Sequence, residues 1–182
     1  QALNEDAKAW MRALPRQIRF TLAGRCIGVI HGGIDAISQY IFASTPTALK
    51  ADIIERLDVD AVIGGHCGLP FSEICGDGLW HNAGAIGMPA NDGTTRVWFS
   101  ILTPDEETGA IDITLHHFGY DHAAAAQAIH TVTPNLPYAE TLEDGLWPNM
   151  SVLPKPERQQ QGRPLDPRPV VWTPSASAVA AE

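Results

Sequence analysis

Short apolar runs separated by polar turns predict a mixed succession of strands and helices. Residues 18–33 and 71–84 alternate between apolar and polar positions and turn at Ala23-Gly24 and at Gly76-Asp77-Gly78, which is typical of β-hairpins. The short apolar run at 60–66 predicts a buried strand. Residues 95–120 read as two more strands joined by a polar turn.

Helical spacing of apolar residues occurs in four other segments. A stripe of apolar side chains between Asn4 and Pro15 predicts a helix with Asn4 as its cap. Helices are also expected over 36–42, over 48–59 and over 121–132, the last capped by Asp121. The mixed order of helices and strands is typical of an α/β or α+β fold built on a layered sheet.

The composition changes from about residue 151. Six of the fourteen prolines lie between residues 154 and 174, followed by a Ser/Ala-rich end. The pattern predicts two parts, a domain over 1–150 and an extended arm over 151–182, anchored by Trp147 and Trp172. We expect loss of the arm to leave the fold intact and to lower its stability modestly.

Charge and composition exclude several classes of function. The net charge is −9, and no cluster of basic residues is present, so a nucleic-acid backbone is not an expected ligand. No apolar run approaches the roughly 20 residues of a membrane span, and no signal-like N-terminus is visible. Three cysteines without paired spacing favour reduced thiols and a cytoplasmic location. The oligomeric state stays open.

Two histidines follow apolar strands in the same way. His31 directly follows the apolar residues of "VIHGG", and His66 ends the run "AVIGGH". Ligands of layered α/β proteins collect at strand ends, and a neutral imidazole is a common ligand of divalent metals. A single histidine of this kind is more often bonded to a backbone carbonyl, but the repeated pattern favours a shared metal ion.

Three motifs in order carry a family resemblance. The segments "VIHGG", "VIGGHCGLPF" and "NAGAIGMP" resemble the C-terminal motifs of the calcineurin-like metallophosphoesterases. The resemblance implies a four-layer α-β-β-α sandwich, here lacking its N-terminal segment. It also implies hydrolysis of a phosphate mono- or diester of small size at a two-metal site holding Mn, Zn, Fe or Mg. His31 and His66 match two ligands of one ion.

The departures from the family pattern keep a second interpretation open. Gly68 stands where the family has a second histidine, and His81 is a possible substitute ligand. The family's N-terminal motifs are absent, so catalytic residues are expected upstream of Gln1. The alternative is a binding or scaffold protein with a degraded metal site. Cys67 is either a thiolate ligand or, as we expect, an inert buried thiol.

Three further polar residues are candidates for a substrate pocket. Asn82 lies in the glycine-rich third motif, and Asn91 and Asp92 follow it in a segment whose composition also fits a plain turn. Trp147 lies in "EDGLWPNM", where it either covers a cleft or ties the arm to the domain.

Overall fold

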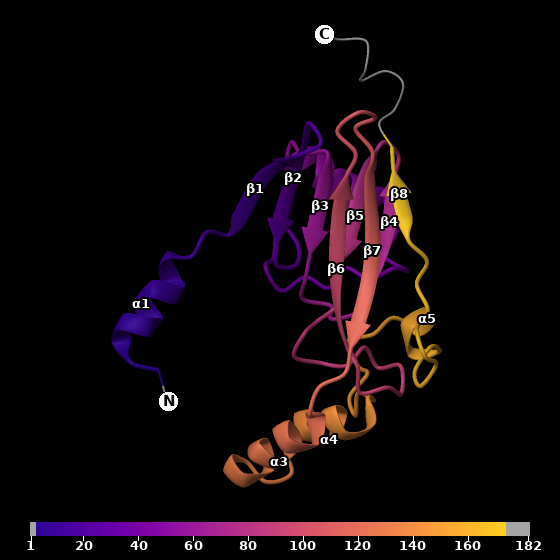
Figure 1. Ribbon diagram of the computed structural model, residues 1–182. Coiled ribbons are helices and arrows are strands. Elements are labelled where there is room, and N and C mark those ends of the chain that lie inside the picture. The colour runs from indigo at the N-terminus through magenta and orange to yellow at the C-terminus, as the bar shows by residue number, and fades with distance from the viewer. Residues whose placement is uncertain (1–2, 174–182) are drawn as a thin grey trace.

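Two β-sheets packed face to face form the centre of the computed structural model, which describes residues 3–173 (Figure 1). The Ser/Ala-rich end beyond residue 173 lies outside the described residues. Ile27, Ala61 and Leu79 from the first sheet meet Ile111 and Ile113 from the second, all at most 1% exposed. These contacts bury the inner faces of both sheets, and they confirm the expected α/β fold with packed sheets.

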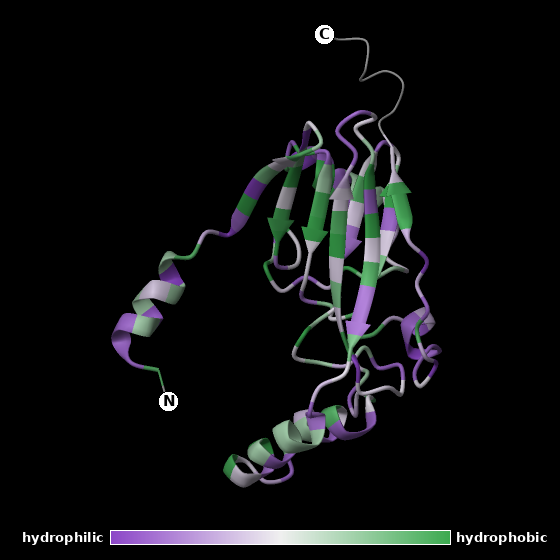
Figure 2. Cartoon of the chain, viewed as in Figure 1, coloured by the Kyte–Doolittle hydropathy of each residue, from purple (hydrophilic) through white to green (hydrophobic). Residues whose placement is uncertain are grey.

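The larger sheet holds the strands that carry the histidine motifs. Its strands are β1 (Gln17–Leu22), β2 (Arg25–Ile30), β3 (Ala61–Gly64), β4 (Phe71–Cys75) and β5 (Gly78–Asn82). Their order is β1-β2-β3-β5-β4, in which β2, β3 and β5 run parallel and the two edge strands run antiparallel. β2 and β3 are predominantly apolar, as expected of central strands (Figure 2).

The smaller sheet is antiparallel and includes part of the C-terminal arm. Its strands are β6 (Val97–Pro104), β7 (Ile111–Phe118) and β8 (Val170–Trp172), in that order. β8 pairs with β7, and the Trp172 side chain is 1% exposed among the residues between the sheets. The arm therefore completes a sheet, and removing it should cost more than the modest amount expected from its composition.

Residues 3–173 contain five helices outside the two sheets. They are α1 (Glu5–Ala13), α2 (Thr47–Arg56), α3 (His122–Val132), α4 (Pro137–Asp144) and α5 (Lys155–Arg158). α2 packs against β4 and β5 and buries Ile53 and Ile54, while α3 and α4 pair with each other at one end of the sheets (Figure 1). None of the helices within residues 3–173 is long and apolar enough to cross a membrane.

Local sequence signals placed several of these elements well. The Asn4 Oδ1 atom accepts the Ala7 N–H bond at the start of α1, and Asp121 Oδ1 accepts the Ala124 N–H bond at the start of α3. Both expected caps are confirmed. The apolar stripe of α1 is not buried, however, since Trp10 is 65% exposed and the helix projects away from the sheets (Figure 1).

The prediction of a helix over 36–42 is wrong. The structure has turns and irregular backbone there, and Ile41 and Phe42 are buried in separate clusters. Tyr40 and Phe42 stack with ring centroids 5.6 Å apart. Tertiary packing of these side chains has overridden the helical spacing of the apolar residues, which was a weak signal over seven positions.

Candidate metal centre

The three motifs meet at one edge of the larger sheet. β2 leads into His31, β3 leads through Gly65 into His66, and β5 ends at Asn82. Because β2, β3 and β5 are parallel neighbours, their carboxyl ends lie together. The sheet topology thus gathers residues that are separated by up to about fifty positions in the sequence.

His31 and His66 are in direct contact. The His31 Nε2 atom lies 2.9 Å from His66 Nδ1, and the Gly65 N–H donates to the His31 carbonyl at 2.8 Å. At this distance the two rings share a hydrogen bond, and an ion bound by both nitrogens at about 2.0–2.1 Å in a tetrahedral shell would hold them slightly farther apart. The expected convergence of the two rings is found, and the pair fits part of a metal coordination shell; the ligand role itself stays a prediction.

The backbone at His66 is strained in a way that serves this contact. His66 has a φ angle of +58°, a left-handed conformation that is uncommon outside glycine. At Gly65, a Cβ atom would lie 3.2 Å from the His31 carbonyl oxygen, so a larger residue would push the two loops apart. The glycines before His66 therefore permit a close approach between the ends of β2 and β3.

The surroundings of His66 favour the neutral form of its ring. Burial, followed by the nearby His31 ring, lowers the pKa of His66 below its ordinary value. The Tyr40 ring packs against His66 with centroids 4.3 Å apart, and the His66 Nε2 atom is buried without a hydrogen-bond partner among the described residues. A neutral imidazole is the form that binds metals.

No further ligands join the pair within residues 3–173, where no group of three or more His, Cys, Asp or Glu side chains is arranged to hold an ion. Cys67 is 1% exposed, and burial raises the pKa of its thiol to about 11. The Asn82 Nδ2 atom lies 3.1 Å from Cys67 Sγ. This environment is that of an inert buried thiol.

The structure places His81 away from the pair. Its Nδ1 atom lies 2.8 Å from Ser72 Oγ, and its Nε2 atom lies 2.7 Å from Ser100 Oγ, so His81 links the two sheets. The side chain is 0% exposed, and burial lowers its pKa to about 4. Both nitrogens are engaged by hydroxyl groups, and neither is left for an ion. The geometry gives no support to His81 as a substitute ligand.

Asn82 holds the loop that carries His66. Its Nδ2–H group donates to the Gly65 carbonyl at 2.9 Å, and its Oδ1 accepts from the Gly84 N–H at 2.9 Å. Asn82 is 1% exposed, so these bonds are made away from water. It acts on the site through the backbone before His66 and not as an exposed pocket residue.

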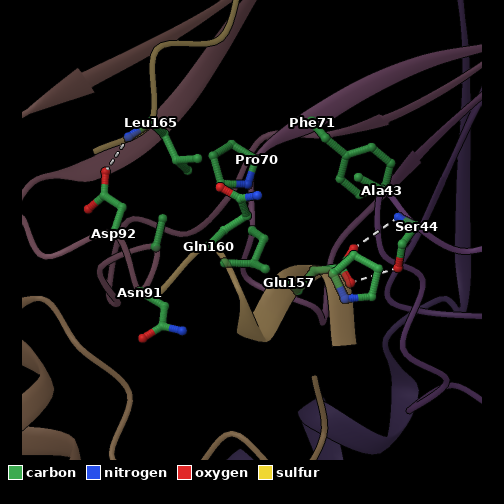
Figure 3. A pocket seen from close by; sticks show the side chains of 12 residues that line it. Ala43, Ser44, Pro70, Phe71, Asn91, Asp92, Glu157, Gln160 and Leu165 are labelled. Atoms are coloured by element: carbon green, nitrogen blue, oxygen red, sulfur yellow. Dashed lines mark hydrogen bonds between the residues drawn. The ribbon is translucent and has the colours of Figure 1, made fainter. Parts of the chain in front are cut away.

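Asn91 and Asp92 line a pocket that does not include the histidine pair. It is closed by α5 and the segment after it (Figure 3). Asn91 Oδ1 accepts from the Trp147 N–H at 2.7 Å, and Asp92 Oδ2 accepts from the Leu165 N–H at 3.0 Å. Burial opposes ionisation of Asp92, but bonds from Leu165, Thr94 and Arg96 lower its pKa overall. Asn91 Oδ1 also accepts from Gln161 Nε2 at 3.2 Å, so both residues attach the C-terminal arm to the domain.

The Ser44 side of the same pocket is also fastened to α5. The Ser44 N–H and hydroxyl donate to the two carboxylate oxygens of Glu157 at 2.9 and 2.6 Å, as Figure 3 shows. His31 and His66 are not among the lining residues of this pocket. The pocket that Asn91 and Asp92 line is therefore separate from the histidine pair, and their role at a substrate pocket stays a prediction.

Gly68 cannot receive a second histidine without rearrangement. It has a φ angle of +69°, and a Cβ atom would lie 2.8 Å from Met88 Cε and 3.4 Å from the Trp147 ring. The Met88 methyl group can move, so the backbone conformation carries most of the cost. The Met88 side chain occupies the space directly beside the Cα atom of Gly68.

Replacing Gly68 by alanine should lower the free energy of unfolding by about 1–2 kcal/mol, mainly because alanine disfavours the left-handed conformation. Gly76→Ala should cost a similar amount, since Gly76 has a φ of +66° with nothing within 4 Å of a Cβ. Gly119→Ala is the control, because no atom crowds its Cβ and its φ is not positive. Urea denaturation measures the free energy of unfolding of the three variants. Equal values would show that the left-handed conformation at Gly68 and Gly76 carries no such cost.

Comparison with solved structures shows the fold. A hypothetical protein from Pyrococcus horikoshii matches with a TM-score of 0.64 and 17% identity, over 77% of this chain and 54% of that one. A metallophosphoesterase from Sphaerobacter thermophilus matches with a TM-score of 0.64 and 19% identity, over 79% of this chain and 64% of that one. No family model and no curated protein matches.

The chain has a metallophosphoesterase-like fold. At these identities the likeness establishes the architecture, and it confirms the fold class expected from the three motifs. The chain spans 54% and 64% of the length of the two structures.

Proposed function

We propose that the protein is a metal-dependent hydrolase of small phosphate mono- or diesters, in which His31 and His66 bind one divalent ion. The observation that carries this proposal is the 2.9 Å approach of the two ring nitrogens at the carboxyl edge of β2 and β3. The likeness of the fold to a metallophosphoesterase supports the same reading. Mn, Zn, Fe and Mg all fit the proposal, and the remaining ligands would be supplied by groups outside this pair.

Neighbouring residues favour the protonation state and the position of His31 and His66 that would suit a bound ion. A bound divalent ion would polarise a phosphoryl oxygen and lower the pKa of a bound water. The lowered pKa of His66 favours the neutral ring, in which one nitrogen has a free lone pair for an ion. Asn82 fixes the Gly65 carbonyl, and Gly65 in turn bonds to His31, so the two strand ends stay at a constant separation.

A second candidate function is binding without catalysis on the same fold. The observation that favours it is position 68, where glycine and the neighbouring Met88 replace the second histidine of the family. Such a protein would bind an ion or a phosphate group without turnover. Hydrolysis of bis(4-nitrophenyl) phosphate with added Mn²⁺ separates the two, because only the first candidate releases 4-nitrophenol.

Binding of Co²⁺ provides the direct test of the histidine pair. His31→Ala and His66→Ala should each weaken Co²⁺ binding at least tenfold, because each removes one of the nitrogen ligands. His117→Ala is the matched control, since His117 is exposed on β7 and lies outside the pair. Visible absorption of bound Co²⁺ and calorimetry measure the affinities. Equal affinities in all four proteins would show that the pair is not a metal site.

A further inference from the structure

A cleft opens beside His66, on the side formed by α4 and the segment after it. Its volume is about 270 Å³. We call it the His66 cleft, and the lining residues that matter here are His66, Tyr40, Met88, Tyr138, Trp147 and Val152. The pocket of Figure 3 is separate, since the two have no lining residue in common. The cleft therefore connects the histidine pair to a space that the proposed metal chemistry does not use.

The aromatic walls of the His66 cleft are held in place by hydrogen bonds. Trp147 Nε1–H donates to the Pro89 carbonyl at 2.8 Å, and the Trp147 ring is buried. The Tyr138 hydroxyl donates to the Gly87 carbonyl. Tyr40 packs against the ring of His66 at 4.3 Å. A ligand would thus meet ring faces that are already ordered, which reduces the entropic cost of binding.

The lining contains no charged side chain. None of its residues is Asp, Glu, Lys or Arg, and most of its surface is aromatic or aliphatic. A second phosphate or a carboxylate would enter this space without a cation to balance its charge, which is costly away from water. An uncharged ring would instead gain stacking contacts and apolar burial. An engineered cavity of about 150 Å³ accepts benzene, so 270 Å³ has room for a group of one or two rings.

We propose that the His66 cleft binds a flat, uncharged aromatic group, and that the substrates are aryl or similar ring-bearing phosphate esters. The part that concerns substrates rests on the proposed function, with the phosphate at His31 and His66 and the ring against Tyr138 and Trp147. The binding of the ring does not depend on a metal. It follows from the shape and chemistry of the cleft, so the two proposals can fail separately.

The test uses an uncharged ring with no phosphate. 4-Nitrobenzyl alcohol is titrated into the metal-free protein, and (4-nitrocyclohexyl)methanol is the saturated counterpart with the same substituents and no π face. Binding is followed by NMR at the indole N–H of Trp147 and at the backbone amide of His66. We expect saturable shifts at both positions, with affinity for the aromatic alcohol at least threefold higher than for the saturated one.

A filled cleft and a matched control complete the experiment. Val152→Phe should weaken 4-nitrobenzyl alcohol binding at least fivefold, because the added ring occupies the cleft. Val132→Phe should leave it unchanged within twofold, since Val132 lies on α3 with 83% exposure and does not line the cleft. Val152 is itself 42% exposed, and thermal unfolding checks that both variants fold.

Different results of these experiments overturn the cleft proposal and the proposed function. No saturable shift in the wild-type protein, equal affinity for the two alcohols, or equal weakening in both phenylalanine variants overturns the cleft proposal. If the wild-type protein binds the aromatic alcohol but does not bind Co²⁺, the proposed function is overturned and the cleft proposal stands. Binding of both supports a hydrolase that prefers aryl esters, and hydrolysis of 4-nitrophenyl methyl phosphate should then fall in Val152→Phe and not in Val132→Phe.

Discussion

Replacing Trp172 by alanine is expected to lower the free energy of unfolding by about 3–5 kcal/mol, which is the usual cost of emptying a buried aromatic site. Trp172 is 1% exposed and packs between the sheets against Ile111 and Ile113. Its Nε1–H donates to the Asp77 carbonyl at 2.9 Å, and the Arg25 guanidinium lies 3.9 Å from its ring centroid. The cost is a large share of the 5–15 kcal/mol that typically stabilises a domain.

Val171→Ala is the matched control in the same strand. Val171 is 54% exposed and faces outward, so its replacement should change the free energy of unfolding by less than about 0.5 kcal/mol. Urea denaturation followed by far-UV circular dichroism measures both variants. If Trp172→Ala proved as mild as Val171→Ala, the arm would be an appendage, as its proline content alone predicts.

Acid should destabilise the protein through His81. Burial lowers the pKa of His81 to about 4, whereas a histidine in the unfolded chain titrates near about 6.5. As the pH falls below about 6.5, the unfolded chain takes up a proton that the folded protein excludes. The contribution of His81 is therefore complete above that pH and falls by about 2–3 kcal/mol as the pH approaches 4.

The measurement compares pH dependences and not absolute stabilities. Urea denaturation at pH 7.0 and pH 4.5 should show a smaller loss of stability for His81→Gln than for the wild-type protein, with a difference of about 2 kcal/mol. His117→Gln, at an exposed position on β7, should retain the wild-type loss. An equal loss in all three proteins would mean that His81 titrates normally in the folded state.

Local chemistry explains why much of the fold could be predicted. The hairpin turns at Ala23-Gly24 and Gly76-Asp77-Gly78 need left-handed backbone, and Ala23, Gly24 and Gly76 adopt it. The caps at Asn4 and Asp121 depend on bonds across three residues. Such signals are contained in a few neighbouring positions, so a sequence pattern can report them. The helix missed at Pro137–Asp144 has no side-chain cap bond at its start to mark it.

The sequence pattern predicted only part of the candidate site. The pattern that placed His31 and His66 at strand ends was correct, because parallel neighbouring strands bring their ends together. The roles of Asn91 and Asp92 were not visible, since their partners Trp147 and Leu165 lie 56 and 73 positions away. Tyr40 was placed on a helix that does not exist, so its stacking on His66 could not be anticipated.

By itself, the sequence determined the strand-histidine-glycine motifs, the principal hairpins and two helix caps, because these depend on contacts within a few residues. Only the tertiary structure decided which side chains those motifs meet. It joined His81 to serines of both sheets, placed Met88 beside Gly68 and buried Trp172 between the sheets. Burial and pairing of this kind depend on segments far apart in the chain, whose approach is set by the packing of whole sheets.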